Sequence, residues 1–159
     1  MDNAQVIKNF YQAFQNKDWE AMQKCYHHEV HFSDPVFPHL HGQQAKAMWH
    51  MLVAASTDLK ITFSNVTAHD DRGSCHWEAE YTFSKTGRLV HNAIKAEFEF
   101  KDGRIIRHTD SFDLWKWSKM ALGISGILLG WSPFMKQKIR TMAGQNLHNF
   151  IAKNTSYQS

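Results

Sequence analysis

The residues of this sequence best suited to proton chemistry are a histidine and an aspartate on one face of a predicted strand. His108 and Asp110 belong to residues 94–117, where alternating side chains flank an Asp-Gly turn typical of a β-hairpin. Because strand side chains alternate between two faces, both residues stand on the face of Ile106 and Phe112. An ionisable pair among apolar residues is costly unless its members are paired or hydrogen-bonded. The pattern indicates either a catalytic or ligand-orienting pair, or a structural pair bonded to backbone or water.

Three helices and a run of strands must position this pair. Asp2 and Asp18 cap two predicted helices, and the second of these includes Tyr26. A short strand over residues 30–35 ends at a proline, which cannot continue a hydrogen-bonded ladder. A third helix follows and carries Trp49 on its apolar stripe.

From residue 59 onward the apolar period changes from helical to two. An irregularity is expected near Ser64 and Asn65, and turn signals divide the strands at residues 70–73, 85–87 and 101–103. Helices followed by long antiparallel strands predict an α+β fold with the helices laid on one face of the sheet.

Composition limits the classes of protein to which the chain belongs. Its 159 residues suit one domain, and its 43% hydrophobic and 21% charged residues are those of a globular protein. The net charge is only +3, and the lysines and arginines are scattered apart from Lys136, Lys138 and Arg140, so no nucleic-acid partner is expected. Two cysteines make no disulfide framework, and the start has no apolar signal segment. We expect a cytoplasmic protein without a transmembrane segment, since the apolar run after Trp117 is about half as long as a span.

The order of these elements and three motifs resemble the nuclear-transport-factor-2-like (NTF2-like) superfamily, in its SnoaL-like and ketosteroid-isomerase-like branch. The motifs are FYQAFQNKDWEAMQKCY, VHFSDPVFPHLHG leading into a helix, and FKDGRIIRHTDSFD. The resemblance covers residues 3–117. It implies a cone-shaped curved antiparallel sheet wrapped around the N-terminal helices, a deep apolar pocket and, commonly, a homodimer.

The division of the chain follows from this resemblance. Residues 1–117 form the NTF2-like domain, and residues 118–159 form a helical C-terminal extension that the resemblance does not explain. We expect the extension, whose last helix opens at Pro133, to pack on the domain or on a partner. A pocket lid or a membrane-surface contact is the alternative.

The resemblance places Asp34 at the general-base position of the ketosteroid isomerases. Phe10 stands at the position of their oxyanion-hole tyrosine, with Tyr11 adjacent, and Ala96 stands at the position of their protonated aspartic acid. The base is kept and both donors are absent, so isomerisation by that mechanism is not expected. The structural alternative for Asp34 is an aspartate before proline that accepts backbone N–H bonds in a turn.

The same register predicts a pocket that is mostly aromatic and apolar, as small-molecule sites are. The predicted catalytic residues are Asp34, His108 and Asp110, and the predicted substrate-binding residues are Trp49, Trp77, Tyr81, Asn92, Ile94 and Phe112. Carboxylates in such surroundings have raised pKa values that suit proton transfer near neutral pH. No cofactor is expected, and no metal either, because the eleven histidines form no HExxH pattern.

Three functional hypotheses follow. The first is a cofactor-free enzyme, of isomerase, cyclase or dehydratase type, acting on a hydrophobic small molecule that carries a carbonyl group or fused rings. The second is a non-catalytic module that binds an apolar ligand in the same pocket. The third is a dimeric interaction protein whose extension recruits a partner. Fold alone does not decide among them.

Overall fold

The structure is a computed structural model that describes residues 2–129 and 132–158. The helices are α1 (Asn3–Gln15), α2 (Trp19–Lys24), α3 (Gln43–Ala55), α4 (Leu114–Leu122), α5 (Ile124–Leu129) and α6 (Pro133–Lys153), followed by the 3-10 helix η1 (Thr155–Tyr157). The strands are β1 (Tyr26–Ser33), β2 (Leu40–His41), β3 (Lys60–His69), β4 (Arg72–Phe83), β5 (Arg88–Lys101) and β6 (Arg104–Ser111). These strands form one sheet in the order β2-β1-β6-β5-β4-β3.

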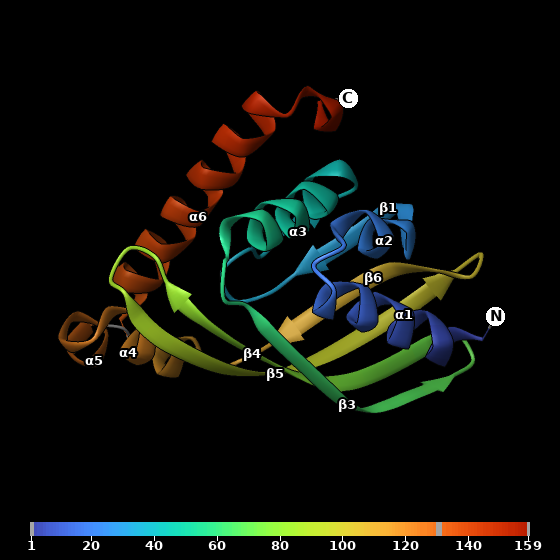
Figure 1. Ribbon diagram of the computed structural model, residues 1–159, viewed down its shortest axis with the longest axis horizontal. Helices are drawn as coiled ribbons and strands as arrows, with labels where there is room; N and C mark the ends of the chain where they lie inside the picture. The colour runs from blue at the N-terminus through green and yellow to red at the C-terminus, as the bar shows by residue number, and fades with distance from the viewer. Residues whose placement is uncertain (1, 130–131, 159) are drawn as a thin grey trace.

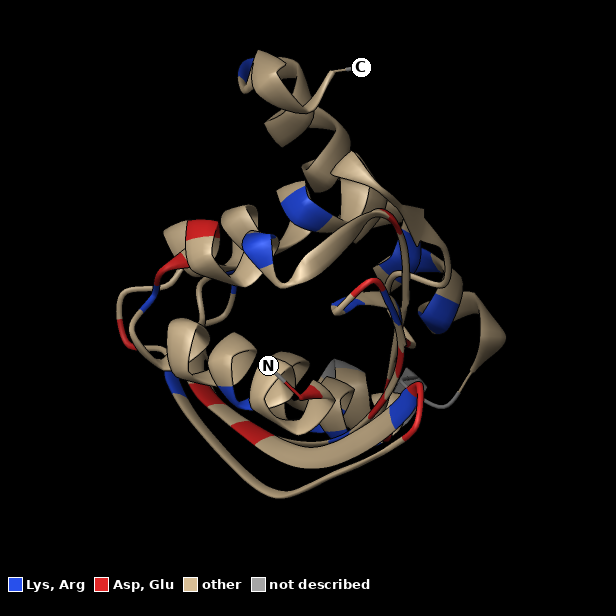
Figure 2. Ribbon diagram, turned by 90° about the vertical axis from the view of Figure 1, so that its right-hand side faces the viewer, with Lys and Arg blue, Asp and Glu red and all other residues tan. Residues whose placement is uncertain are grey.

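The sheet is curved, and α1, α2 and α3 lie on its inner face (Figure 1). Figure 2 shows the sheet curling around α1. The core between these layers is largely aromatic, and Phe10, Tyr11 and Trp49 are among its largest fully buried side chains. The predicted α+β fold with helices on one face of a curved sheet is confirmed.

The predicted helix caps are confirmed, but the end of the second helix is not where the pattern placed it. The carboxylates of Asp2 and Asp18 accept hydrogen bonds from the backbone of α1 and α2, at Gln5 N and Ala21 N. α2 ends at Lys24, and Tyr26 begins β1 instead of continuing the helix. The segment is a strand because it pairs with β6: Ile105 N donates a hydrogen bond to the carbonyl oxygen of Cys25, the residue before Tyr26, at 2.8 Å.

The β5–β6 hairpin turns through Asp102 and Gly103, both at positive φ, as the Asp-Gly signal predicts. The register shifts just after the turn, so that Phe100 faces Ile105 while Glu99 faces Arg107. Ile106 is the extra residue of this β-bulge. The prediction that Ile106 shares the face of His108 is therefore wrong: Ile105 is fully buried inside, and Ile106 lines a groove on the outer face.

The C-terminal extension packs on the domain through α4 and α6. α4 contacts β5, and α6 contacts α3 and buries Leu147. Gly126 lies so close to α4 that a Cβ atom there would overlap the Ser118 carbonyl oxygen, which explains a glycine at this crossing. Gly130 and Trp131, part of the predicted apolar run, lie outside the described residues. Within the described ranges, no helix combines the length and hydropathy needed to cross a membrane.

Candidate functional site

His108 and Asp110 lie inside the sheet and belong to a continuous hydrogen-bonded chain. The Trp49 Nε1 atom donates to the Tyr26 hydroxyl at 2.7 Å, and that hydroxyl lies 2.7 Å from His108 Nδ1. On the other side of the ring, His108 Nε2 lies 2.9 Å from Asp110 Oδ1, and Trp77 Nε1 donates to the same oxygen at 3.2 Å. The register that pairs Ala96 with Asp110 puts a small side chain where the carboxylate needs room.

The direction of each bond follows from what an indole can do. Trp49 only donates, so the Tyr26 oxygen accepts from it and the Tyr26 hydroxyl proton is free to point at His108 Nδ1. With Nδ1 as the acceptor of this bond, His108 Nε2 is the donor to Asp110 Oδ1. In this assignment every donor in the series of hydrogen bonds has an acceptor, and the Asp110 carboxylate is the last acceptor of the series.

Aromatic rings enclose His108 completely. Its ring centroid lies 4.5 Å from that of Phe98, 5.0 Å from that of Phe32 and 5.5 Å from that of Phe10, and Trp49 stacks on it at 5.9 Å. Its exposed fraction is 0%. With both ring nitrogens bonded and both faces covered, this histidine is positioned to fix the orientation of Asp110.

Asp34 occupies the loop after β1. Its Oδ1 atom accepts backbone hydrogen bonds from Val36 N at 2.7 Å and Phe37 N at 2.6 Å, as an aspartate in a turn does. Burial nevertheless raises the pKa of the Asp34 carboxyl to about 7, and the charge of Asp110 adds to this rise. The two backbone bonds and the guanidinium of Arg140 act in the opposite direction on the same pKa. Asp34 is thus half-buried and half-ionised near neutral pH.

A cavity of about 260 Å³ lies beside the Asp34 loop. It is lined by Pro35, Phe112, Asp113, Leu114, Trp115, Lys136 and Arg140. Arg140 Nε donates to the Pro35 carbonyl oxygen at 2.8 Å, so α6 is anchored to the loop next to Asp34. Within the described ranges, no carboxylate forms an ion pair with Arg140. The cavity is therefore lined by apolar side chains, by the cations Lys136 and Arg140 and by Asp113, and it lies next to the loop that carries Asp34.

The structure brings together some of the predicted site residues and separates others. Trp49, Trp77 and Ile94 are buried in the core with His108 and Asp110. Phe112 lines the cavity beside Asp34, and the half-buried Tyr81 accepts a hydrogen bond from Trp117 Nε1 at 2.8 Å.

Asn92 stands out among the predicted residues. It is 8% exposed on the inner face of β5, opposite Ala79. Its side-chain amide makes no hydrogen bond with any described residue, and it lines neither the cavity beside the Asp34 loop nor the one on the outer face of the sheet.

Sequence reasoning missed Tyr26 and Arg140. Tyr26 was assigned to a helix, yet its spacing from Val30 and Phe32 matches a strand interrupted by one irregularity, and the register shift before His31 is that irregularity. Arg140 carries no comparable signal, because its approach to Pro35 joins residues 105 positions apart.

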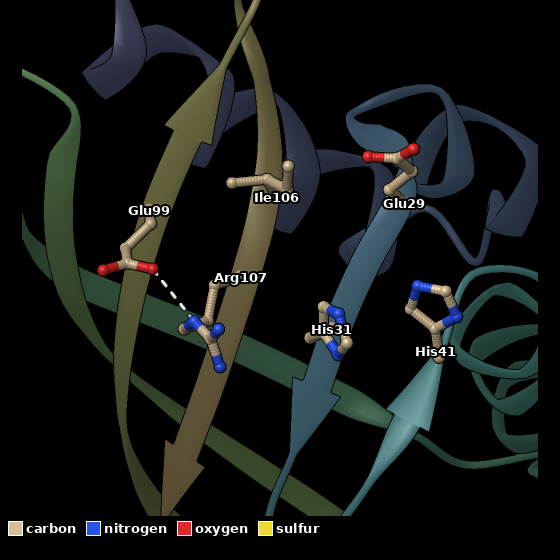
Figure 3. Close-up of a pocket in the computed structure, with 6 residues that line it drawn as sticks. All are labelled: Glu29, His31, His41, Glu99, Ile106 and Arg107. Carbon is tan, nitrogen blue, oxygen red and sulfur yellow. Dashed lines mark hydrogen bonds and ion pairs between the residues drawn. The ribbon is translucent and has the colours of Figure 1, made fainter.

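A second cavity, of about 400 Å³, lies on the outer face of the sheet (Figure 3). Its lining residues are Glu29, His31, His41, Glu99, Ile106 and Arg107. The His31 and His41 rings stand beside each other on paired strands, 4.4 Å apart, and Arg107 pairs with Glu99 at 2.9 Å. Desolvation in the groove and the nearby His41 lower the pKa of His31.

One set of metal-ligating side chains occurs in the part of the chain that the structure describes. The ligand atoms of His27, His28 and Glu29 lie within 4.8 Å of one another at the start of β1. Neither this set nor the outer groove includes a predicted catalytic residue.

Comparisons with known proteins agree on the fold. A family model described as SnoaL-like domain matches residues 7–108, whereas no curated protein sequence matches the chain. IdmH, a putative polyketide cyclase from Streptomyces antibioticus, is similar with a TM-score of 0.65 at 18% identity, over 78% of this chain and 100% of that one.

Two further solved structures are similar to this chain. A putative polyketide cyclase from Xanthomonas campestris gives a TM-score of 0.60 at 23% identity, over 73% and 96% of the two chains. An LEH-like epoxide hydrolase from M. tuberculosis gives 0.63 at 16% identity, over 80% and 95%.

Proposed function

This chain belongs to the SnoaL-like domain family of the NTF2-like superfamily, and from that premise we propose that it binds a hydrophobic carbonyl compound and transfers a proton through Asp34 without a cofactor. The observation that carries the proposal is the Asp34 carboxyl, whose pKa burial raises to about 7 beside a cavity with apolar walls. A base with a pKa near the working pH combines a large ionised fraction with a strong affinity for the proton. Two similar structures are described as putative polyketide cyclases, which supports a carbonyl-rich substrate.

The chemical step assigns a task to each side of the cavity. The Asp34 carboxylate takes a proton from the carbon next to a substrate carbonyl, and the electron pair of the broken C–H bond moves to the carbonyl oxygen as an enolate. The Arg140 guanidinium, held by Pro35, stabilises the negative charge on that oxygen. Arg140 would thus replace the two donors whose positions Phe10 and Ala96 occupy.

The buried chain around His108 has a positioning task in this proposal. It fixes the Asp110 carboxylate, whose charge helps to raise the pKa of Asp34. Trp49, Trp77 and Ile94 pack in the core around His108 and Asp110, and Phe112, Leu114 and Trp115 supply the apolar side chains of the cavity.

Hydrogen exchange tests the proposal without knowledge of the natural substrate. A panel of aromatic β-keto esters is incubated with the protein in D2O, and incorporation of deuterium at the acidic carbon is followed by mass spectrometry. We expect catalysed exchange whose rate rises with pH through about 7 as Asp34 ionises. Asp34→Asn should abolish the exchange, while Asp71→Asn, an exposed carboxylate in the β3–β4 turn, should keep it. Exchange that persists in Asp34→Asn would overturn the proposal.

A non-catalytic binding module is the second candidate, and the enclosure of His108 favours it. Proton transfer would rest on Asp34 alone, because both ring nitrogens of the buried His108 are already hydrogen-bonded. In that case the same panel shifts the NMR signals of Phe112 without any deuterium uptake, and Asp34→Asn leaves the affinity unchanged.

A further inference from the structure

The charge of this chain is divided sharply between the segment that begins with α4 and the rest of the sequence. Residues 114–159 contain six lysines and arginines and no aspartate or glutamate. All 15 acidic residues and the other 12 basic residues lie in residues 1–113. Residues 114–159 therefore carry a net charge of +6, and residues 1–113 a net charge of −3.

Residues 114–159 also expose large apolar side chains. Ile124 and Phe134 are 76% and 72% exposed, and Ile127 and Trp115 are 52% and 40% exposed. Figure 1 shows α4, α5 and the start of α6 gathered at one end of the molecule, beside the β4–β5 turn. Leu89, 69% exposed, follows that turn. Exposed apolar residues gathered at one place mark an interaction surface.

Basic side chains accompany this apolar end. Lys116, Lys136 and Lys138 are exposed on the same helices, and Lys119 lies over the Trp115 ring at 4.1 Å. Arg88 Nε donates to the Met120 carbonyl oxygen at 2.8 Å, which places another cation at the end of α4. Protruding apolar tips with cations around them and no acidic residue in the segment are the features of interfacial membrane binding.

We propose that the end formed by α4, α5 and the start of α6 docks on an anionic membrane surface. Ile124, Ile127 and Phe134 enter the interface between headgroups and acyl chains, and the lysines meet the anionic headgroups. A lipid surface fits better than a protein partner, because lysines accompany the exposed apolar side chains and residues 114–159 contain no aspartate or glutamate, which suits anionic headgroups. Trp115 and Lys136 also line the cavity beside Asp34, so an apolar molecule dissolved in the bilayer would meet the cavity directly.

The test is sedimentation of the full chain with vesicles, with no substrate present, so its outcome does not depend on the proposed proton transfer. We expect binding to phosphatidylcholine vesicles that contain about one third phosphatidylserine, weaker binding to pure phosphatidylcholine, and loss of binding at high salt. The double variant Ile127→Ser with Phe134→Ser should reduce partitioning at least about tenfold. Leu52→Ser, which removes an apolar residue 40% exposed on α3, should leave it unchanged.

Three results would overturn the proposal. The first is no binding to either vesicle. The second is equal binding to both vesicles at all salt concentrations. The third is a concentration-dependent dimer that Phe134→Ser dissociates in sedimentation velocity, since the surface would then join two copies of the chain. Circular dichroism melting of the double variant, expected to match the wild type because both side chains are exposed, separates loss of docking from loss of fold.

Discussion

Asp110 and Asp34 are two carboxylates that influence each other electrostatically, but they accept hydrogen bonds from different kinds of donor. Asp110 receives its hydrogen bonds from the side chains of His108 and Trp77, inside the aromatic core. Asp34 receives its bonds from the backbone of its own loop, at Val36 and Phe37, and stands beside a cavity. Tertiary contacts therefore hold the Asp110 charge in the folded state, whereas the Asp34 charge is only locally supported and costs stability. The comparison separates a carboxylate held by tertiary contacts from one held only by the backbone of its own loop.

Removal of Asp110 should give the largest effect. Asp110→Ala leaves His108 Nε2 and Trp77 Nε1 as buried donors without their acceptor. We expect a loss of about 3 to 5 kcal/mol in the free energy of unfolding, measured by urea denaturation. Asp71→Ala, which removes an exposed carboxylate, should stay within about 0.5 kcal/mol of the wild type. A loss at Asp110 as small as that of the control would break the comparison.

Removal of the Tyr26 hydroxyl should give the next largest effect. Tyr26→Phe keeps the ring that stacks on Phe10 but removes the acceptor of Trp49 and the donor to His108. Two buried polar groups lose their partner, and we expect a cost of about 2 to 3 kcal/mol by the same denaturation experiment. Tyr157→Phe, at a half-buried hydroxyl bonded to His50 and Gln23, is the matched control and should cost about 1 kcal/mol or less, because water can reach the partners that it leaves. Equal losses of unfolding free energy in the two variants would mean that the buried hydrogen bonds of Tyr26 contribute no more to stability than the half-buried ones of Tyr157.

Asp34→Asn, unlike the two variants above, should raise the free energy of unfolding. We expect a gain of about 1 to 2 kcal/mol, and only at high pH. The folded pKa of Asp34, raised to about 7, exceeds its ordinary value of 3.8. Between these values the folded chain binds more protons than the unfolded chain, so the stability of the wild type falls as pH rises through this window. The Asn variant keeps an Oδ1 acceptor without the charge. We expect it to melt a few degrees above the wild type near pH 8 and at or below it near pH 4. Higher wild-type stability near pH 8 would contradict this.

Arg140→Gln should give the smallest change in stability, below about 1 kcal/mol, because Arg140 is partly exposed. Its sharper effect is on the Asp34 carboxyl, whose pKa the guanidinium lowers. We expect the pKa of Asp34, followed by carbon-13 NMR titration, to move upward in this variant. Lys138→Gln removes a cation from the same helix that does not line the cavity, and it should leave that pKa in place. An unchanged pKa of Asp34 in Arg140→Gln would show that burial, Asp110 and the two backbone hydrogen bonds set it without Arg140.

The sequence predicts those parts of the fold that local chemistry determines. Asp2 and Asp18 cap their helices, and the Asp102-Gly103 turn closes the hairpin, because each signal acts over a few residues. The bulge at Ile106 has no such signal, since neither glycine nor proline marks it. The bulge turns Ile106 to the outer face but leaves His108 and Asp110 on the inner face. The predicted inward orientation of His108 and Asp110 therefore agrees with the structure.

The surroundings of the candidate site were less accessible to sequence reasoning. The aromatic enclosure of His108 and the approach of Arg140 to Pro35 join segments far apart in the chain. Alternation along a strand shows which side chains point inward, but it does not show what fills the interior. The roles predicted for Asp34, His108 and Asp110 therefore remain predictions that the experiments above address.

The parallel pairing of β1 with β6 has a consequence for how the protein folds. Phe32 faces His108 across this pair, and the hydrogen bond from Tyr26 to His108 spans 82 positions. Closing so long a loop is entropically costly and is repaid only once the sheet has formed, so such contacts slow the folding of a domain. During synthesis, α1, α2, β1 and α3 leave the ribosome well before the strand that covers their aromatic faces. The nascent chain must keep those faces from aggregating until β6 arrives, which makes the early steps of folding the stage at which a chaperone is most useful.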